Sequence, residues 1–313
     1  MNFVYAFDNN YDVQGFVAIK SLLDNVSKNI CIYIIHKDPD SFQKYYKELE
    51  SHENLDSITI HKFNSDDLIF PNIENKHVSE ATYYRLYLNK YLPKNLETLI
   101  YLDSDILCLN DPIPYLTNVV KKINSENCLL AARSEHIKNV NNNYLFKNLN
   151  LNSINYFNAG VLVMNYKKWI EEEVYLKLQN AVLHNEVDLM WWDQDILNKV
   201  IDGNFIDLNY FLNFKLSLDW KVNEQYLNDE VIFLHYQGKL KPWTISGLLG
   251  KHSKLYQEIY LDTDIANDKY HLIKENSIID LLVLVKSIFN FRIFNLKNPV
   301  AVILKVISNV ING

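Results

Sequence analysis

The chain has 313 residues, of which 48% are hydrophobic and 22% charged, and its formal net charge is −7 at pH 7. A chain of this length can bury a large core, as one large domain or as a domain with an appendage. The acidic balance argues against a general nucleic-acid binder, which normally presents a basic face. Three cysteines, an odd number, favour reduced thiols in a cytosolic protein over a disulfide framework. The N-terminal MNFVYAFDNN lacks the basic and long apolar regions of a signal peptide.

Short apolar runs alternate with amphipathic segments of helix length over the first two thirds of the chain. We predict strands at 3–7, 30–35, 57–63, 98–103, 128–132 and 159–165. We predict helices at 12–26, 41–52, 79–90 and 167–184. Continuous apolar strands separated by helices predict an α/β fold with a mostly parallel, doubly wound sheet. Ligands of such sheets bind beyond the carboxyl ends of the strands, where Asp8, Asp103 and Asp105 would lie.

Two other segments stand apart from this alternation. The Asn-rich residues 138–156 predict a loop or a short helical insertion, and we expect 138–156 and 209–228 to build the acceptor cleft. The apolar C-terminal stretch that begins at Ser277 carries four basic side chains against one acid from Asp280 onward. Its uncharged stretches fall short of the roughly 20 residues that span a bilayer. This pattern favours an amphipathic segment on an anionic membrane, with a buried helix pair or a self-association surface as the alternatives.

The stretch TLIYLDSDILCLN places Asp103 and Asp105 at the end of a buried strand. Carboxylates there cost desolvation energy unless a metal ion, an arginine or water meets them. The D-x-D spacing alone is a weak signal, because it occurs four times in the chain. Asp38 and Asp40 are explained by a turn and a helix cap, whereas apolar runs flank Asp103 and Asp105 on both sides.

No glycine pattern in the chain offers a backbone cradle for a diphosphate, so a metal held by carboxylates is the natural substitute. In DEVIFLHYQGKLKPW, His235 ends another apolar run, and Gly238 and Lys241 follow it. A strand-end histidine is more often a packed structural residue. Here an imidazole with two carboxylates would suit Mn²⁺, with Mg²⁺ a poorer match, and Lys241 would add a point charge for phosphates.

Six motifs in this order resemble glycosyltransferase family 8 over roughly residues 1–245: FVYAFDNNY, SEATYYRLYL, IYLDSDIL, YFNAGVLVMN, WWDQDILN and LHYQGKLKPW. The likeness is greatest to bacterial lipooligosaccharide and lipopolysaccharide galactosyltransferases. The resemblance implies a retaining, Mn²⁺-dependent enzyme with a GT-A type fold, a single Rossmann-like, mostly parallel sheet flanked by helices. It implies a catalytic domain over 1–250, and we expect a small helical, membrane-associating extension over 251–313.

The resemblance also implies roles for matching residues. The uridine and ribose of a UDP-sugar would be held by Ala6, Asp8 and Asn10. The segment Asp103-Ser104-Asp105 would bind Mn²⁺ together with His235, and Gly238 and Lys241 would close over the diphosphate. Arg85 would contact the sugar or its phosphate. The transferred hexose would be framed by Asn158, Ala159, Asp193 and Gln194. The structural alternatives are a cap for Asp8, a surface ion pair for Arg85 and a helix N-cap for Asp193.

Retention of configuration raises the question of the nucleophile. Gln194 is an amide and a poor nucleophile, and helical geometry would point Asp193 and Asp195 elsewhere. We therefore favour same-face attack by the acceptor, with the departing phosphate as base and Gln194 as an electrostatic stabiliser.

The expected partners follow from the same resemblance. The donor would be UDP-galactose or UDP-glucose, and the acceptor a lipid-linked saccharide at the inner leaflet, which places the protein at the cytoplasmic face of the membrane. A nucleotidyltransferase would usually carry a Gly-rich phosphate loop, and an inactive carbohydrate-binding scaffold would be favoured by loss of a metal ligand.

Overall fold

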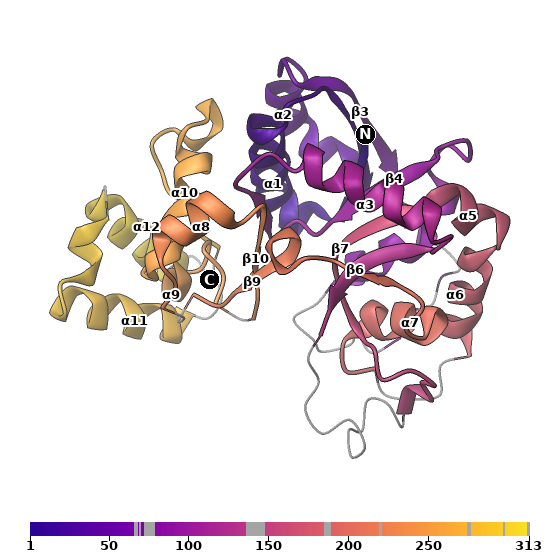
Figure 1. Cartoon of the computed structure of the whole chain (residues 1–313). Coiled ribbons are helices and arrows are strands. Elements are labelled where there is room, and N and C mark those ends of the chain that lie inside the picture. The colour runs from indigo at the N-terminus through magenta and orange to yellow at the C-terminus, as the bar shows by residue number, and fades with distance from the viewer. Residues whose placement is uncertain are drawn as a thin grey trace.

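The computed structural model describes residues 1–65, 68, 70–71, 79–135, 148–184, 189–218, 221–238, 240–273, 277–296 and 298–311. A seven-stranded sheet with the order β3-β2-β1-β4-β7-β6-β8 forms its centre (Figure 1). Its strands are β1 (Asn2–Phe7), β2 (Ile30–His36), β3 (Leu55–Lys62), β4 (Thr98–Leu102), β6 (Leu130–Ser134), β7 (Phe157–Asn165) and β8 (Ile206–Asp207). β7 runs antiparallel to β4 and β6, and the other pairings are parallel. The predicted α/β fold with a mostly parallel sheet is confirmed.

Both faces of this sheet are buried, which explains the continuous apolar runs. In β1, Phe3, Tyr5 and Phe7 face one core and Val4 and Ala6 face the other. The first core is covered by three helices, α1 (Asp12–Asn25), α2 (Pro39–Leu49) and α3 (Ile113–Ser125). The second is covered by the 3₁₀ helix Glu80–Lys90, α5 (Tyr166–Glu171), α6 (Val174–Leu183) and α7 (Trp192–Ile201).

A small second sheet lies beside the carboxyl edge of the first. It has the order β5-β10-β9, with β5 (Ile106–Cys108), β10 (Phe233–Tyr236) and β9 (Phe214–Leu216). β10 runs antiparallel to β5 and parallel to β9, and α8 (Glu224–Glu230) lies between β9 and β10 in the chain. The apolar residues after the Asp103–Asp105 turn therefore begin a new strand in a different sheet.

Two of the predicted helices differ in detail. Residues 80–90 wind as a 3₁₀ helix with a kink at Tyr87 rather than as an α-helix. Most of this segment is buried, so packing sets its winding rather than helix propensity. The helix expected over 167–184 is broken into α5 and α6, because Glu173 adopts a left-handed backbone with φ of 51°.

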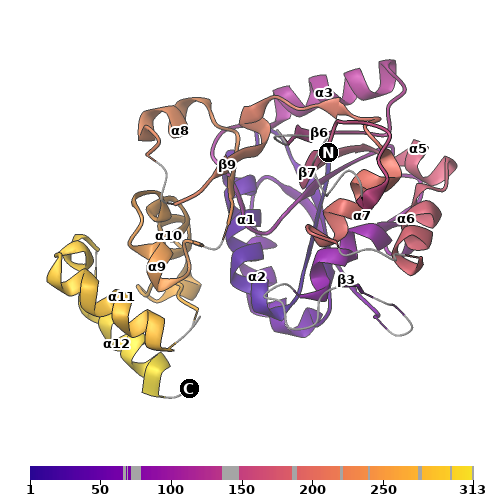
Figure 2. The ribbon, with the colours of Figure 1, turned by 90° about the horizontal axis from the view of Figure 1, so that it is seen from below.

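The C-terminal part packs in two ways. α10 (Lys254–Leu261) contributes Tyr256 to the main core, where its ring lies 5.0 Å from that of Trp243. α11 (Ser277–Phe289) and α12 (Pro299–Ile311) form a helix pair that lies to one side of the sheet (Figure 2). This pair shares a small core with Leu248 of α9 (Ile245–Leu248). Among the described residues, no helix has both the length and the apolar character that crossing a membrane requires.

Candidate functional site

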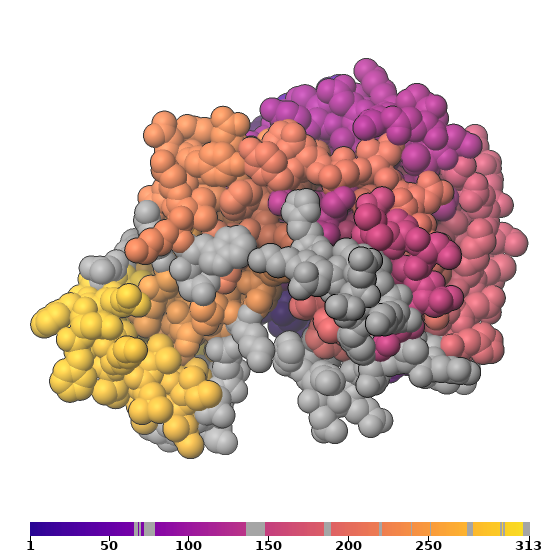
Figure 3. Space-filling model, turned by 60° about the horizontal axis from the view of Figure 1, so that its bottom comes forward, coloured from indigo at the N-terminus to yellow at the C-terminus, as the bar shows by residue number. Residues whose placement is uncertain are grey.

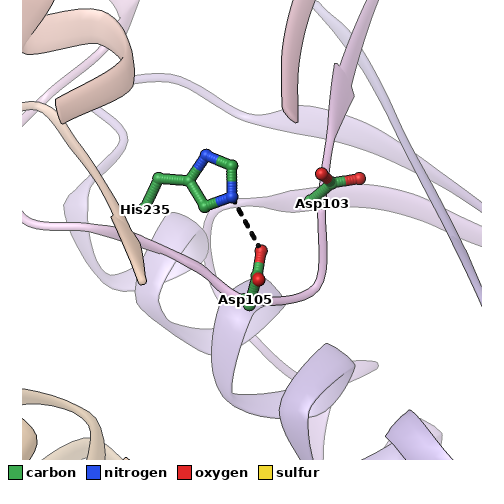
Figure 4. A group of neighbouring side chains, drawn as sticks. All are labelled: Asp103, Asp105 and His235. Atoms are coloured by element: carbon green, nitrogen blue, oxygen red, sulfur yellow. Dashed lines mark ion pairs between the residues drawn. The ribbon is translucent and has the colours of Figure 1, made fainter. Parts of the chain in front are cut away.

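Two strands from different sheets bring the predicted metal ligands together. β4 ends at Leu102, and Asp103 and Asp105 lie in the turn that leads into β5. β5 pairs antiparallel with β10, so that Ile106 lies opposite His235. Each of the three predicted ligands offers one atom within 4.8 Å of the other two (Figure 4). The grouping of Asp103, Asp105 and His235 is thus present.

Asp103 uses one of its carboxylate oxygens on protein partners. Oδ1 accepts a hydrogen bond of 2.8 Å from the Tyr101 hydroxyl and lies 3.1 Å from Nη1 of Arg85. The backbone N–H of Asp103 donates to the carbonyl of Gly160 on β7 at 2.9 Å. These contacts fix the side chain and leave Oδ2 as the oxygen that can meet a further cation.

Asp105 has one oxygen in an ion pair and the other without a hydrogen bond. Oδ2 lies 2.7 Å from Nζ of Lys241, and Oδ1 lies 3.3 Å from Nε2 of His235. Oδ1 is buried, and within the described part of the chain no group donates a hydrogen bond to it. Burial opposes ionisation, but Lys241 and His235 outweigh it and hold the pKa of Asp105 well below its usual range.

These residues fit a divalent cation. A buried, ionised oxygen without a donor is costly unless positive charge meets it, and Oδ1 of Asp105 is such an atom. Two carboxylates and an imidazole form a mixed oxygen and nitrogen set, which suits Mn²⁺ better than Mg²⁺.

Arg85 lies buried between two carboxylates. Its Nη1 is 3.1 Å from Oδ1 of Asp103 and its Nε is 2.5 Å from Oδ2 of Asp193. Nη1 also donates to the carbonyl of Ala159 at 2.5 Å. Burial opposes the charge of Arg85, but the two carboxylates outweigh it and raise its pKa. Arg85 therefore does not form the surface ion pair considered above.

Asp193 is the buried partner of this arginine. Its Oδ1 accepts a hydrogen bond of 2.8 Å from the Thr82 hydroxyl. Burial raises the pKa of Asp193 to about 6, against the opposing effects of Arg85 and Thr82. Asp193 is not the helix N-cap, because α7 has Trp191 at that position and no side-chain cap among the described residues. Oδ2 of Asp195, inside α7, accepts from the backbone N–H groups of Met190 and Trp191 at 2.7 and 2.9 Å.

The residues expected to hold uridine follow the carboxyl end of β1. Asp8 caps the 3₁₀ turn Asn9–Tyr11 by accepting from the N–H of Asn10 at 3.0 Å, so the cap considered above is present. Ala6 is buried in the strand, and Asn10 is exposed in the turn. In Figure 3, residues of this N-terminal part, in indigo, are visible at the bottom of a hollow in the surface.

Gln194 of α7 contacts the residues of β7 that were predicted to frame the sugar. Its Oε1 accepts from the N–H of Ala159 at 3.0 Å and from Nδ2 of Asn158 at 3.3 Å. Its Nε2 donates to the Tyr156 hydroxyl at 3.2 Å. The amide is thereby held in one orientation at the same sheet edge as Asp103.

The remaining predicted residues lie around the Asp103–Asp105 turn. The Lys241 ammonium is engaged by Asp105 and donates to the carbonyl of Tyr236 at 2.6 Å. Ser104 is buried, and no described group hydrogen-bonds its hydroxyl. Gly238 has a φ of +83°, a conformation that glycine adopts without strain, and a Cβ added there would meet no described atom within 4 Å.

Two residues near the site were missed by the sequence reasoning. Burial, and after it the charges of Asp105, Asp8 and Asp103, raise the pKa of Tyr11. The motif FVYAFDNNY contained Tyr11, so its proximity to Asp8 was a signal available in the sequence. The second residue, Asn213, is fully buried and accepts from or donates to the His235 ring at 3.0 Å. No sequence pattern around Asn213 indicated that it would lie at the site.

Comparisons with known proteins add a family to this geometry. Residues 2–246 match the model of glycosyl transferase family 8. A Haemophilus influenzae protein described only as a glycosyltransferase is 32% identical over 247 residues, which cover 78% of this chain and 73% of that protein. A lipopolysaccharide 1,2-glucosyltransferase of Escherichia coli is 28% identical, with 78% of this chain and 72% of that protein covered.

A solved structure shows the same fold. The galactosyltransferase LgtC, in complex with donor and acceptor sugar analogues, superposes with a TM-score of 0.68 over 85% of this chain and 99% of that chain. The sequences are 22% identical, so this likeness concerns the fold alone.

Proposed function

Because the chain belongs to glycosyl transferase family 8, we propose that it moves a hexose, galactose or glucose, from a UDP-sugar to a saccharide acceptor with retention of anomeric configuration. The observation that carries the proposal is the grouping of Asp103, Asp105 and His235 at the carboxyl edge of the sheet. This edge is where open α/β sheets bind their ligands.

The diphosphate would lie at these three side chains. A bound Mn²⁺, or less favourably Mg²⁺, would neutralise the charge that develops on the leaving UDP. Oδ1 of Asp105 is buried and accepts no hydrogen bond from a described residue, and this supports a cation at this place. Lys241 would turn from Asp105 to the phosphate oxygens once the cation neutralises the carboxylate, and Gly238 gives the neighbouring backbone room for that approach.

The nucleoside would lie at the end of β1. Ala6, Asp8 and Asn10 would hold uridine and ribose. The hexose would lie between Arg85 and the Gln194 amide, next to Asn158 and Ala159. Ser104, with a buried hydroxyl that no described residue bonds, would face the same ligand.

The chemistry of transfer follows from the state of the carboxylates near Gln194. Asp193 is held in a buried ion pair with Arg85, and Asp195 accepts from the Tyr156 hydroxyl and two backbone N–H groups. Neither is thereby available as a nucleophile under the sugar, which supports same-face attack. The bond from C1 to the diphosphate oxygen breaks, the acceptor oxygen bonds to C1, and the acceptor proton passes to the departing phosphate. Gln194 Oε1 would stabilise the positive charge that develops on the sugar, with Asp193 holding Arg85 in place.

The acceptor would be a lipid-linked saccharide of a cell-surface glycan such as lipopolysaccharide or lipooligosaccharide. The names of relatives support this, among them the Escherichia coli glucosyltransferase and a lipopolysaccharide 1,3-galactosyltransferase of Salmonella typhimurium that is 26% identical over 77% of this chain and 72% of its own. Such an acceptor would bring the protein to the inner face of the cytoplasmic membrane.

The outer face of the α11–α12 pair supports that location. Large apolar side chains are exposed there, including Phe289 at 79% and Phe291 at 73%. Basic residues, Lys286 and Arg292 among them, lie in the same segment. Helices that bind at a membrane surface typically combine two kinds of side chain. Apolar side chains enter the acyl boundary, and basic side chains meet the anionic headgroups. We propose that residues 251–313 form this extension and 1–250 the catalytic domain, with α10 packed on the latter.

A donor assay separates this function from its alternatives. UDP release from UDP-galactose and UDP-glucose is measured with Mn²⁺, with and without a saccharide acceptor. A transferase gives acceptor-dependent release, and proton NMR of the product gives its anomeric configuration. A nucleotidyltransferase would instead release pyrophosphate from UTP and a sugar 1-phosphate, and a scaffold would bind without turnover. Pyrophosphate release, or an inverted product, would contradict the proposal.

A further inference from the structure

A chain of side-chain amides connects α7 to the proposed metal site. Nδ2 of Asn158 donates to Oε1 of Gln194 at 3.3 Å, and Nδ2 of Asn213 donates to Oδ1 of Asn158 at 2.9 Å. Oδ1 of Asn213 then lies 3.0 Å from Nδ1 of His235. This series of hydrogen-bonded amides therefore ends on His235, a proposed metal ligand.

Backbone groups determine which group donates and which accepts in each hydrogen bond of this amide network. The N–H of Gly160 donates to Oδ1 of Asn158 at 3.0 Å, and a backbone N–H can only donate. That oxygen is therefore the acceptor, and the group that reaches it from Asn213 must be the NH₂ of the amide. The other end of the Asn213 amide, which faces His235, is consequently its oxygen. The amide orientation thus follows from the network, which is the sound basis for assigning it.

The orientation of Asn213 determines which ring nitrogen of His235 carries a proton. An amide oxygen only accepts, so Nδ1 must be the N–H donor. The opposite tautomer would place two acceptors 3.0 Å apart. In the neutral ring Nε2 then carries the lone pair, 3.3 Å from Oδ1 of Asp105, which accepts no hydrogen bond within the described part of the chain. These two atoms are both acceptors, and a cation between them is what would make their proximity favourable.

We propose that Asn213 is a positioning residue that holds His235 in the Nδ1–H tautomer and thereby presents the Nε2 lone pair to a divalent cation. The proposal rests on the metal site of the proposed function. Histidine ligands of metals commonly donate their second nitrogen to such a partner, which fixes the ring. Asn213 suits the role because it is fully buried and its backbone carbonyl accepts a hydrogen bond from Nη1 of Arg133 at 2.7 Å.

Gly160 supports the same arrangement because its backbone lies close to the His235 ring. A Cβ added at Gly160 would come within 2.5 Å of Cε1 and 2.8 Å of Nδ1 of His235. Real Cβ atoms do not approach so closely, so any larger residue would displace the ring from Asn213. The backbone of β7 and the Asn213 amide together leave the imidazole one position.

The test compares two substitutions of Asn213 in the full-length protein. Asn213→Leu removes both hydrogen bonds at similar volume, whereas Asn213→Asp keeps an acceptor for Nδ1–H and loses only the donor to Asn158. Mn²⁺ affinity is measured by titration calorimetry without nucleotide. The tautomer is measured from the ¹⁵N shifts of histidine-labelled, metal-free protein at pH 8, with the His235 signals assigned from a His235→Gln sample.

We expect Asn213→Leu to lower Mn²⁺ affinity about 10- to 100-fold, as loss of an outer-shell partner does, and to mix the two tautomer signals. Asn213→Asp should keep the Nδ1–H signal and recover most of the affinity. The matched control is Asn198→Leu. Asn198 is an equally buried asparagine that, among the described residues, bonds only backbone groups, those of Phe157 and Gln194, and none of the side-chain amides of the network. Its loss should therefore lower stability while leaving the His235 signals and Mn²⁺ affinity unchanged.

An Nε2–H signal for His235 in the wild-type protein would overturn the proposal even if Asn213→Leu fails to fold. So would Mn²⁺ affinity within twofold of wild type in folded Asn213→Leu. If the wild-type protein binds no Mn²⁺, the proposed metal site fails, and the tautomer measurement still decides the role of Asn213.

Discussion

The Nζ atom of Lys241 lies 2.7 Å from Oδ2 of Asp105. The same carboxylate offers its other oxygen, Oδ1, to the proposed cation. Lysine and cation therefore share one carboxylate, and arrival of the cation would release the ammonium to the phosphates of a nucleotide sugar. Substitution of Lys241 should therefore change two quantities, the affinity for UDP and the stabilisation of the protein by the cation.

Replacing Lys241 tests the shared carboxylate. We expect Lys241→Met to weaken UDP binding about 10- to 100-fold in the presence of Mn²⁺, because a charged hydrogen bond to phosphate is lost. Mn²⁺ should raise the Tm of the variant more than that of wild type, because only the cation then neutralises Asp105. Calorimetry and thermal unfolding measure the two effects, with exposed Lys47→Met as control. Unchanged UDP affinity would exclude Lys241 from the phosphate site.

The buried pair of Arg85 and Asp193 predicts strong coupling in stability. Arg85→Met should lower the free energy of unfolding by about 3–5 kcal/mol, because it leaves the buried carboxylate of Asp193, and the partly buried one of Asp103, without their positive partner. Adding Asp193→Asn should recover part of that loss, since it removes one of those charges. Urea unfolding measures both, and Lys122→Met, which breaks an exposed ion pair, should change little. A double variant less stable than the single one would contradict this account.

The exposed aromatic residues at the C-terminal end of α11 and just after it are expected to serve membrane binding and not folding. Phe289→Ser combined with Phe291→Ser removes two side chains that are 79% and 73% exposed. We expect sedimentation with vesicles containing phosphatidylglycerol to fall about tenfold or more, while the Tm stays near wild type. Ile154→Ser, at an equally exposed apolar residue outside α11 and α12, is the control. Undiminished vesicle binding by the double variant would refute the membrane face.

His271 predicts a pH dependence of stability. Burial, with a smaller effect of Lys305, lowers the pKa of His271 to about 4, and its Nδ1 lies 2.7 Å from the Tyr256 hydroxyl. The unfolded chain protonates this histidine near its ordinary value of about 6.5, so it binds more protons than the folded state between these values. The contribution of His271 to stability should be complete above pH 6.5 and should fall as the pH decreases toward 4.

The check compares wild type with His271→Gln, whose amide can still bond Tyr256. Urea unfolding from pH 7 to 4.5 should show a steeper decline for wild type, by on the order of 1–3 kcal/mol. Parallel declines in the two proteins would show that His271 does not cause the dependence.

The site residues that could be predicted from the sequence are polar residues that interrupt or end a run of apolar residues. Asp103 and Asp105 interrupt a run of apolar residues that extends from β4 into β5, and His235 ends the run of β10. A polar residue at the end of a doubly buried strand lies at the sheet edge by necessity, so its place could be deduced. That β5 belongs to a second sheet could not, because pairing with β10 joins residues more than a hundred positions apart.

Other features depend on contacts that no local pattern encodes. Asn213 lies in 209–228, a region without clear periodicity, and its partners are set by how β9 lies beside β10. The 3₁₀ winding of 80–90 likewise follows from burial on several sides. Of the predicted loop at 138–156, residues 138–147 lie outside the described part of the chain, and Tyr156 is buried against Asp195.

Whether Asp103 and Asp105 hold a cation for the diphosphate of a UDP-sugar can be measured by isothermal titration with UDP, with and without Mn²⁺. The wild-type protein is compared with the variant Asp103→Ala/Asp105→Ala. We expect UDP binding that requires Mn²⁺ and vanishes in the variant. UDP binding of equal strength without the metal, or its persistence in the variant, would contradict this expectation and leave the two aspartates as structural partners of Arg85 and Lys241.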